Sequence, residues 1–170
     1  NHVKMANGQW GRKMQDDVTD SVNWAVEQGI ADPDNVCIYG ASYGGYAVMA
    51  GITKTPKMYK CAVNYVGVTD MGLLFSKMPK VWEIWEEQQK IEIGDYENDK
   101  EYLDAVSPIN LVDRIETPLY IVHGVRDWRV PIQHAQKLRR ELEKNGKVEG
   151  EDFWWMVKTD EGHGFYKEAN

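Results

Sequence analysis

Short apolar segments alternate with amphipathic ones along this chain. The apolar segments cover 36–39, 61–66, 118–124 and 153–157. Each is a short run of mostly branched or aromatic side chains, which is typical of a strand buried in a parallel sheet. Strands that alternate with helical segments indicate an α/β fold. The sequence therefore predicts a mostly parallel sheet with flanking helices.

Apolar residues at helical spacing occupy the intervals between these strands. The first predicted helix covers 12–28, where apolar positions recur three to four residues apart. Two charged amphipathic helices are predicted around 81–90 and 99–106, and a further helix over 132–145. We find no internal repeat or low-complexity tract. This order of elements agrees with a single α/β unit.

Composition adds limits on size and partners. With 170 residues and 42% apolar content, the chain can bury one core, so residues 1–170 are expected to form one domain. A net charge of −7 argues against nucleic acid and an anionic membrane as partners. No apolar run is long enough to span a membrane. We interpret Cys37 and Cys61 as small core residues in buried strands, not as a disulfide or metal ligands.

The most specific motif is Gly-x-Ser-x-Gly at residues 40–44, directly after the first predicted strand. It is typical of the nucleophile elbow of an α/β-hydrolase, a sharp turn that exposes a serine hydroxyl above the sheet. A side chain at Gly40 or Gly44 is expected to collide with the neighbouring backbone. The alternative is a flexible surface loop. Apolar runs on both sides favour the elbow, with Ser42 as the nucleophile.

A serine nucleophile needs a base, and the base needs an orienting carboxylate. In this fold the order along the chain is Ser, then Asp or Glu, then His. Asp127 lies in the loop after the strand 118–124 and fits that order. Its alternatives are a helix N-cap or a surface ion pair with Arg126 or Arg129. The sequence favours Asp127 as the orienting carboxylate.

The base is selected from four histidines. His2 and His123 precede Asp127 and therefore break the chain order. His134 lies one to two turns into the last predicted helix, where we expect it to be partly exposed. His163 stands between two glycines after the last strand, and the glycines let its imidazole reach across to the serine. We predict His163 as the base, with an ordinary loop histidine as the alternative.

These motifs resemble the catalytic domain of the prolyl oligopeptidase family. The resemblance is carried by the runs 10–17, 40–46, 94–95, 107–109 and 161–165, and by His123-Gly124 with Asp127 and Val130-Pro131. Within the family, the chain is most similar to the acylaminoacyl-peptidase and bacterial dipeptidyl-peptidase branch. The resemblance implies an α/β-hydrolase fold and a serine peptidase that hydrolyses short peptides through an acyl-enzyme, with no metal or cofactor.

The resemblance also points to segments that this sequence lacks. Members of the family carry an N-terminal β-propeller, several strands before the first matching helix, and a closing helix. The chain is therefore expected to be a truncated hydrolase domain. In the family the oxyanion hole combines the N–H after the serine, here that of Tyr43, with a tyrosine hydroxyl from the absent part.

Pocket residues follow from the same resemblance. The residues expected in the pocket wall are Trp128, Arg129 and Val130. The alternative for Arg129 is an exposed arginine in a surface loop. Trp82 and Trp85 lie in an insertion that roofs the site in the family, so they form a lid or else pack onto the sheet.

Two alternative functions remain. A carboxylesterase shares the fold, the elbow and the triad. A catalytically incomplete fragment folds but lacks half of the oxyanion hole. Hydrolysis of peptidyl substrates discriminates the peptidase from the esterase, and labelling of Ser42 by a fluorophosphonate discriminates both from the fragment.

Assembly is the last expectation from the sequence. The strand before an elbow is flanked in this fold by strands that come earlier in the chain, so residues 36–39 are expected to present an unpaired apolar edge. Such an edge invites pairing with another copy, and two-fold symmetry is the simplest solution. We expect a homodimer or higher oligomer, with the helix 12–28 near the contact.

Overall fold

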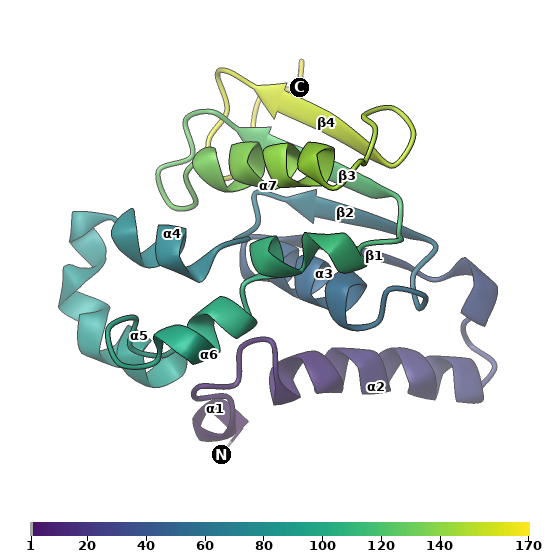
Figure 1. The fold of residues 1–170 in the computed structure, drawn as a ribbon, viewed down its shortest axis with the longest axis horizontal. Coiled ribbons are helices and arrows are strands. Elements are labelled where there is room, and N and C mark those ends of the chain that lie inside the picture. Colours follow the sequence, from purple (N-terminus) through teal and green to yellow (C-terminus); the bar gives the residue numbers. More distant parts are fainter. Residues whose placement is uncertain (1) are drawn as a thin grey trace.

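A parallel sheet forms the centre of the computed structural model, which describes residues 2–170 (Figure 1). The strands are β1 (Cys37–Ala41), β2 (Cys61–Tyr65), β3 (Leu119–Gly124) and β4 (Phe153–Lys158). They lie side by side in chain order, and each neighbouring pair is parallel. Because parallel strands end at one edge of a sheet, the loops after β1, β3 and β4 meet on the same side of the molecule.

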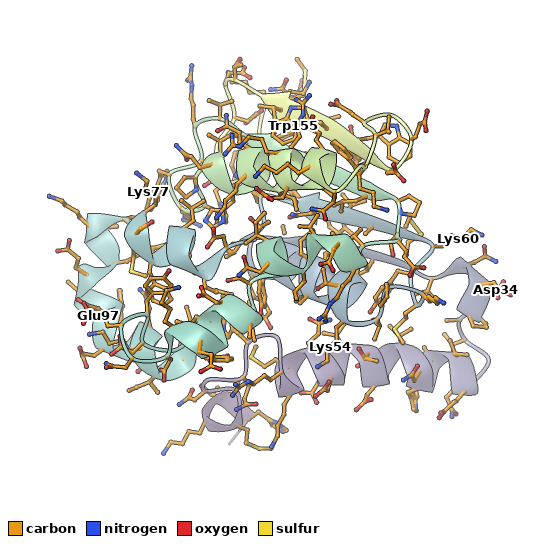
Figure 2. The ribbon with its side chains drawn as sticks, viewed as in Figure 1. Asp34, Lys54, Lys60, Lys77, Glu97 and Trp155 are labelled. Atoms are coloured by element: carbon orange, nitrogen blue, oxygen red, sulfur yellow. A yellow bond between two sulfur atoms is a disulfide. The ribbon has the colours of Figure 1, made fainter. Side chains whose placement is uncertain are left out.

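Helices connect the strands, and α3 and α7 lie over the same face of the sheet (Figure 1). The α-helices are α1 (His2–Met5), α2 (Lys13–Glu27), α3 (Tyr43–Lys54), α4 (Met71–Ser76), α5 (Glu86–Glu92), α6 (Lys100–Ala105) and α7 (Gln133–Lys144). Segments of 3₁₀ helix cover Pro33–Asn35, Lys80–Trp85 and Pro108–Arg114. Lys54 at the end of α3 points toward α2 and forms a 2.6 Å ion pair with Asp16 (Figure 2).

The face of the sheet under α3 and α7 forms the main core. Ala62, Leu119 and Phe153 on this face are each at most 1% exposed, while Ile38 and Trp155 pack against them half-buried. Met49 from α3 and Leu138 from α7 pack against them with no exposed surface. Full burial of one such side chain contributes about 1.5–3 kcal/mol. This packing fixes α3 on the sheet, and with it the turn at which α3 begins.

The opposite face, which we call the open face, is uncovered by the helices of residues 2–170. Successive side chains of a strand point to opposite faces. The register therefore places one row of residues across the open face, namely Tyr39, Val63, Tyr120 and Trp154. Tyr39 is 68% exposed and Trp154 is 42% exposed. Among the described strands β1 pairs with β2 alone, so it forms an exposed, apolar edge of the sheet.

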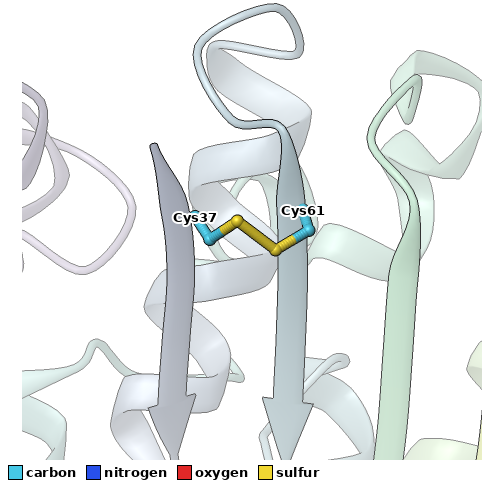
Figure 3. The surroundings of a disulfide bond; sticks show 2 residues. All are labelled: Cys37 and Cys61. Atoms are coloured by element: carbon cyan, nitrogen blue, oxygen red, sulfur yellow. A yellow bond between two sulfur atoms is a disulfide. The ribbon is translucent and has the colours of Figure 1, made fainter. Parts of the chain in front are cut away.

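A disulfide crosses from β1 to β2 on the open face (Figure 3). It joins Cys37 and Cys61, which are partners in the strand register and have Cα atoms 4.7 Å apart. Cys37 is exposed and Cys61 is half-buried. Our expectation of two unpaired core cysteines is therefore wrong, because the sheet places them opposite each other on a face without a helical cover.

The predicted strands and most predicted helices agree with the structure to within a few residues. The segment 81–90 differs, because residues Lys80–Trp85 form a 3₁₀ helix and α5 begins only at Glu86. A 3₁₀ helix has about three residues per turn, so residues three apart lie on the same side. This geometry presents Trp82 and Trp85 together.

Two further properties concern the described part of the chain. None of the helices in residues 2–170 combines the length and the apolar character that crossing a bilayer requires. Within the same residues, no group of three or more His, Cys, Asp and Glu side chains is arranged to hold a metal ion.

Candidate active site

Three loops at the carboxyl edge of the sheet bring Ser42, Asp127 and His163 into contact. The Nε2 atom of His163 lies 2.8 Å from Oγ of Ser42, and its Nδ1 atom lies 2.7 Å from Oδ2 of Asp127. An ionised carboxylate can only accept a hydrogen bond, so Nδ1 carries the proton of the neutral imidazole. Nε2 is then free to accept the hydroxyl proton of Ser42. The imidazole thus bridges a hydroxyl and a carboxylate that are far apart in the sequence.

Ser42 occupies a strained turn between β1 and α3. Its φ of 59° and ψ of −118° lie in a region that residues with a side chain rarely adopt. Gly40 makes the turn possible, because a Cβ atom there would lie 2.3 Å from the backbone oxygen of Gly44. At Gly45, a Cβ atom would lie 2.6 Å from Cα of Gly67.

Gly44 does not have the role that the sequence suggested. A Cβ atom built at Gly44 meets nothing within 4 Å. The expected collision at this position is therefore wrong, and the close backbone approaches fall on Gly40 and Gly45 instead.

The start of α3 supplies a hydrogen-bond donor beside Ser42. Tyr43 is the first residue of the helix, and the first N–H groups of any helix lack a partner one turn earlier. The partial positive charge at a helix start favours an anion there. The Tyr43 ring packs edge-on against Trp10, with centroids 4.6 Å apart. Burial raises the pKa of the Tyr43 hydroxyl, so the phenol stays neutral at physiological pH.

Asp127 is held by its own loop. Its Oδ1 atom accepts hydrogen bonds from the N–H groups of Arg129 and Val130, each at 2.9 Å. These bonds leave Oδ2 for His163. The carboxylate is completely buried, which is incompatible with the alternative of a surface ion pair.

His123, in β3, contacts the loop that carries Asp127. It is 1% exposed, and its Nε2 atom donates a 2.8 Å hydrogen bond to the carbonyl of Val130. Burial lowers the pKa of His123, so the ring is neutral at physiological pH. Nε2 also lies 3.5 Å from Oδ2 of Asp127. The chain order excluded His123 as the base but gave no sign of this supporting contact.

His134 is fully buried, so the expectation of partial exposure is wrong. Its Nδ1 atom accepts a 3.2 Å hydrogen bond from the N–H of Thr69, and its Nε2 atom has no partner among the described residues. Burial lowers the pKa of His134 to about 4. The packing of α7 on the sheet turns this position inward, which the helical periodicity alone did not indicate.

A cavity of about 320 Å³ opens beside Ser42. Its described lining carries no charged side chain and consists of Trp10, Ser42, Tyr43, Val68, Leu74, Met78, Trp82, Trp85, Gln89, Ile93 and Val130. Trp82 and Trp85 thus border the cavity and do not pack on the sheet. The lining therefore suits an apolar group.

The three residues expected in the pocket wall are placed differently from one another. Val130 lines the cavity and is 3% exposed. Trp128 is exposed, and its ring centroid lies 6.2 Å from that of Trp82, which lines the cavity. Arg129 is exposed, and its guanidinium lies 5.3 Å from the centroid of the Trp128 ring. Only the first of the three borders the cavity directly among the described residues.

Sequence reasoning missed Trp10 as part of this site. Trp10 lines the cavity and contacts the rings of both Tyr43 and Tyr46. Gly11 follows it with a φ of +68°, and a Cβ atom there would lie 2.5 Å from the Tyr46 hydroxyl. A glycine after a tryptophan is compatible with many loops, so the sequence held no specific signal for this contact.

Comparison with known proteins places these features in context. A sequence profile described as the prolyl oligopeptidase family matches residues 2–170. The chain is 38% identical over 167 residues to dipeptidyl aminopeptidase BIII of Pseudoxanthomonas mexicana, a match covering 96% of this chain and 24% of that protein. It is 34% identical to dipeptidyl peptidase family member 6 of Caenorhabditis elegans, covering 96% of this chain and 22% of that protein.

Solved structures agree with the sequence comparison. A puromycin-hydrolyzing peptidase of Mycobacterium tuberculosis superposes with a TM-score of 0.85 at 25% identity, over 95% of this chain and 23% of that one. The chain thus spans about a quarter of the length of the relatives it matches. Its parallel sheet with flanking helices is the α/β-hydrolase fold of these neighbours.

Proposed function

Because this chain belongs to the prolyl oligopeptidase family, we propose that residues 1–170 are part of the catalytic α/β-hydrolase domain of a serine peptidase. The observation that carries the proposal is the imidazole of His163 between Ser42 and Asp127, at 2.8 and 2.7 Å. A serine hydroxyl becomes a competent nucleophile when a base at this distance can take its proton.

The proposed reaction is acyl transfer through a covalent intermediate. Oγ of Ser42 attacks the carbonyl carbon of a peptide bond while Nε2 of His163 takes the hydroxyl proton. The N–H of Tyr43 stabilises the negative charge on the carbonyl oxygen. His163 then donates its proton to the leaving amine, and water releases the acyl group by the reverse sequence. Asp127 stabilises the imidazolium throughout, and no metal or cofactor takes part.

The cavity beside Ser42 is proposed to receive the side chain on the acyl side of the cleaved bond. Its uncharged, aromatic lining favours apolar side chains, because a charged group would lose its hydration without gaining a partner. Val130 forms part of the wall. Trp128 and Arg129 are proposed to support the wall by holding Trp82 in place.

The test uses a fluorophosphonate probe and three chromogenic substrates, with Ser42→Ala as the matched control. We expect the probe to label the wild-type chain at Ser42 and peptidyl nitroanilides with an apolar terminal residue to be hydrolysed faster than those with a charged one. If p-nitrophenyl acetate were hydrolysed and none of the nitroanilides were, the result would favour a carboxylesterase. Absence of labelling would indicate a catalytically incomplete chain.

The chain is also proposed to form a homodimer or higher oligomer. The proposal is supported by the exposed edge of β1 and by the apolar row on the open face, in which Tyr39 and Trp154 are exposed. Exposed strand edges and contiguous apolar patches both favour association. Helix α2, which precedes β1, is proposed to lie near the contact.

A further inference from the structure

Tyr65, the last residue of β2, contacts the loops of both Ser42 and His163. Its backbone carbonyl accepts a 3.0 Å hydrogen bond from the N–H of Ser42. Its hydroxyl accepts a 2.5 Å hydrogen bond from the N–H of Phe165, two residues after His163. The ring of Tyr65 also packs edge-on against that of Phe165, with centroids 5.2 Å apart and an interplanar angle of 84°. One residue therefore touches the nucleophile turn through its backbone and the histidine loop through its side chain.

The backbone at the end of β2 is held by both neighbouring strands, so it can fix the positions of both loops. Tyr65 pairs with Ala41 on one side and with Val122 on the other. Val66 follows it with a φ of 46°, a conformation that costs a β-branched residue about 1–3 kcal/mol unless the surroundings enforce it. Here Val66 is completely buried and donates a 2.8 Å hydrogen bond to the carbonyl of Val122. The backbone that carries the Tyr65 ring is thus fixed by both neighbouring strands.

The other contacts of the histidine loop lead away from the serine. The carbonyl of Glu161 accepts a 2.9 Å hydrogen bond from the N–H of Arg126, which ties the loop to that of Asp127. The carboxylate of Glu161 accepts from the N–H groups of Tyr166 and Lys167, at 3.1 and 2.9 Å, within its own segment. These bonds hold the shape of the loop and its distance from Asp127. Asp127 orients the imidazole itself through the 2.7 Å contact with Nδ1 of His163. On the side of the loop nearer Ser42, the backbone after His163 is held by Tyr65.

We infer that Tyr65 is a positioning residue that sets the distance between His163 and Ser42 through the hydrogen bond that its hydroxyl accepts from the N–H of Phe165. The inference rests on the proposed function, since it assigns a purpose to that distance. A displacement of about 1 Å at a reacting pair can lower turnover about 10²-fold. The loss of one of two contacts, with the ring still packed, is expected to cost less than that.

The test is Tyr65→Phe, which removes the hydroxyl and keeps the ring against Phe165. We expect kcat and the rate of fluorophosphonate labelling to fall about ten-fold, with KM changed less than two-fold, because substrate contacts are untouched. Tyr120→Phe is the matched control, since Tyr120 lies on the same face of the sheet and outside the site. It should leave both rates unchanged. Equal rates for Tyr65→Phe and wild type would overturn the inference, as would a rise in KM with constant kcat.

A second measurement separates this inference from the proposed function. Amide hydrogen exchange of Phe165 needs no turnover, and it should be faster in Tyr65→Phe than in wild type, while amides of β3 keep their protection. Unchanged exchange at Phe165 would overturn the inference. If wild type showed no labelling by the probe, the proposed function would fall, and the exchange measurement would still decide whether the Tyr65 hydroxyl holds the loop.

Discussion

Single residues in this molecule are held in states that they would avoid elsewhere. Ser42 has a positive φ, and His134 is an unprotonated imidazole with no exposed surface. Each state costs free energy and persists because close packing enforces it. A substitution at such a position therefore changes activity or the free energy of unfolding for one identifiable reason, which makes these positions suitable for tests.

The proposed catalytic residues should act as a unit. Replacing Ser42 or His163 by alanine is expected to lower turnover of a peptidyl nitroanilide by roughly 10⁴–10⁶, because the proton transfer needs both groups. The double variant should lose little more than either single one, and Asp127→Asn should lower turnover by favouring the wrong tautomer of the imidazole. Steady-state kinetics checks this. An active His163→Ala variant whose activity disappeared with His134→Ala would contradict the assignment of the base.

Two neighbouring glycines should respond in opposite ways to alanine. Gly40→Ala places a Cβ atom 2.3 Å from the Gly44 oxygen, so we expect it to lower the free energy of unfolding. The loss should be about 1–3 kcal/mol or more. Gly44→Ala meets open space inside a helix and should be neutral or stabilising by up to about 1 kcal/mol. Denaturant unfolding of both variants checks the pair, and equal losses would contradict it.

Burial of His134 predicts a pH dependence of stability. Its folded-state pKa of about 4 lies below the ordinary value of 6.5. Between these pH values the unfolded chain binds a proton that the folded chain does not, so the free energy of unfolding falls as the pH is lowered through this window. The shift at His134 alone should lower the free energy of unfolding by about 3 kcal/mol when the pH falls from 6.5 to about 4. The nearby charged groups are Asp70, whose partner is Lys137, and Asp127.

The comparison of wild type with His134→Asn isolates this contribution. The variant keeps an acceptor for the N–H of Thr69 but cannot be protonated in this range. Its stability should therefore depend less on pH between 4 and 6.5 in urea titrations. A residual slope is expected from His123, whose pKa burial also lowers. Identical slopes for the two proteins would contradict the prediction.

At the scale of elements, features that follow from the local sequence pattern could be predicted, and features that depend on strand register could not. The strands were predictable because a run such as 118–124 is mostly apolar, with Leu119 and Ile121 at buried positions. The placement of Ser42, Asp127 and His163 at one edge of the sheet could be expected because each follows a strand. The disulfide was not, since the pairing of Cys37 with Cys61 depends on strand register and on which face the helices leave open. The contact of Tyr65 with Phe165 joins residues 100 apart in the sequence and left no local signal.

The disulfide should stabilise the edge of the sheet. It closes a loop between residues separated by 24 positions, which contains α3 and the Ser42 turn. Chain-entropy arguments give about 3 kcal/mol for a loop of this length. We expect a reductant to lower the free energy of unfolding of wild type by about this amount. The double variant Cys37→Ser, Cys61→Ser should start from the lower value and be insensitive to reductant. An equal effect of reductant on both proteins would contradict the prediction.

At the scale of residues 2–170, helices cover one face of the sheet and leave the other open, and the apolar row on the open face should drive self-association. Light scattering at micromolar concentration is expected to show a dimer or larger species for wild type. Tyr39→Lys places a charge at the exposed edge strand, where a like charge from the partner would face it across a two-fold axis, so it should shift the population to monomer. Ile84→Lys is the matched control, because Ile84 is 79% exposed on the 3₁₀ segment and outside the open face. A wild-type chain that stays monomeric, or equal dissociation by both variants, would show that the open face does not pair with a second copy.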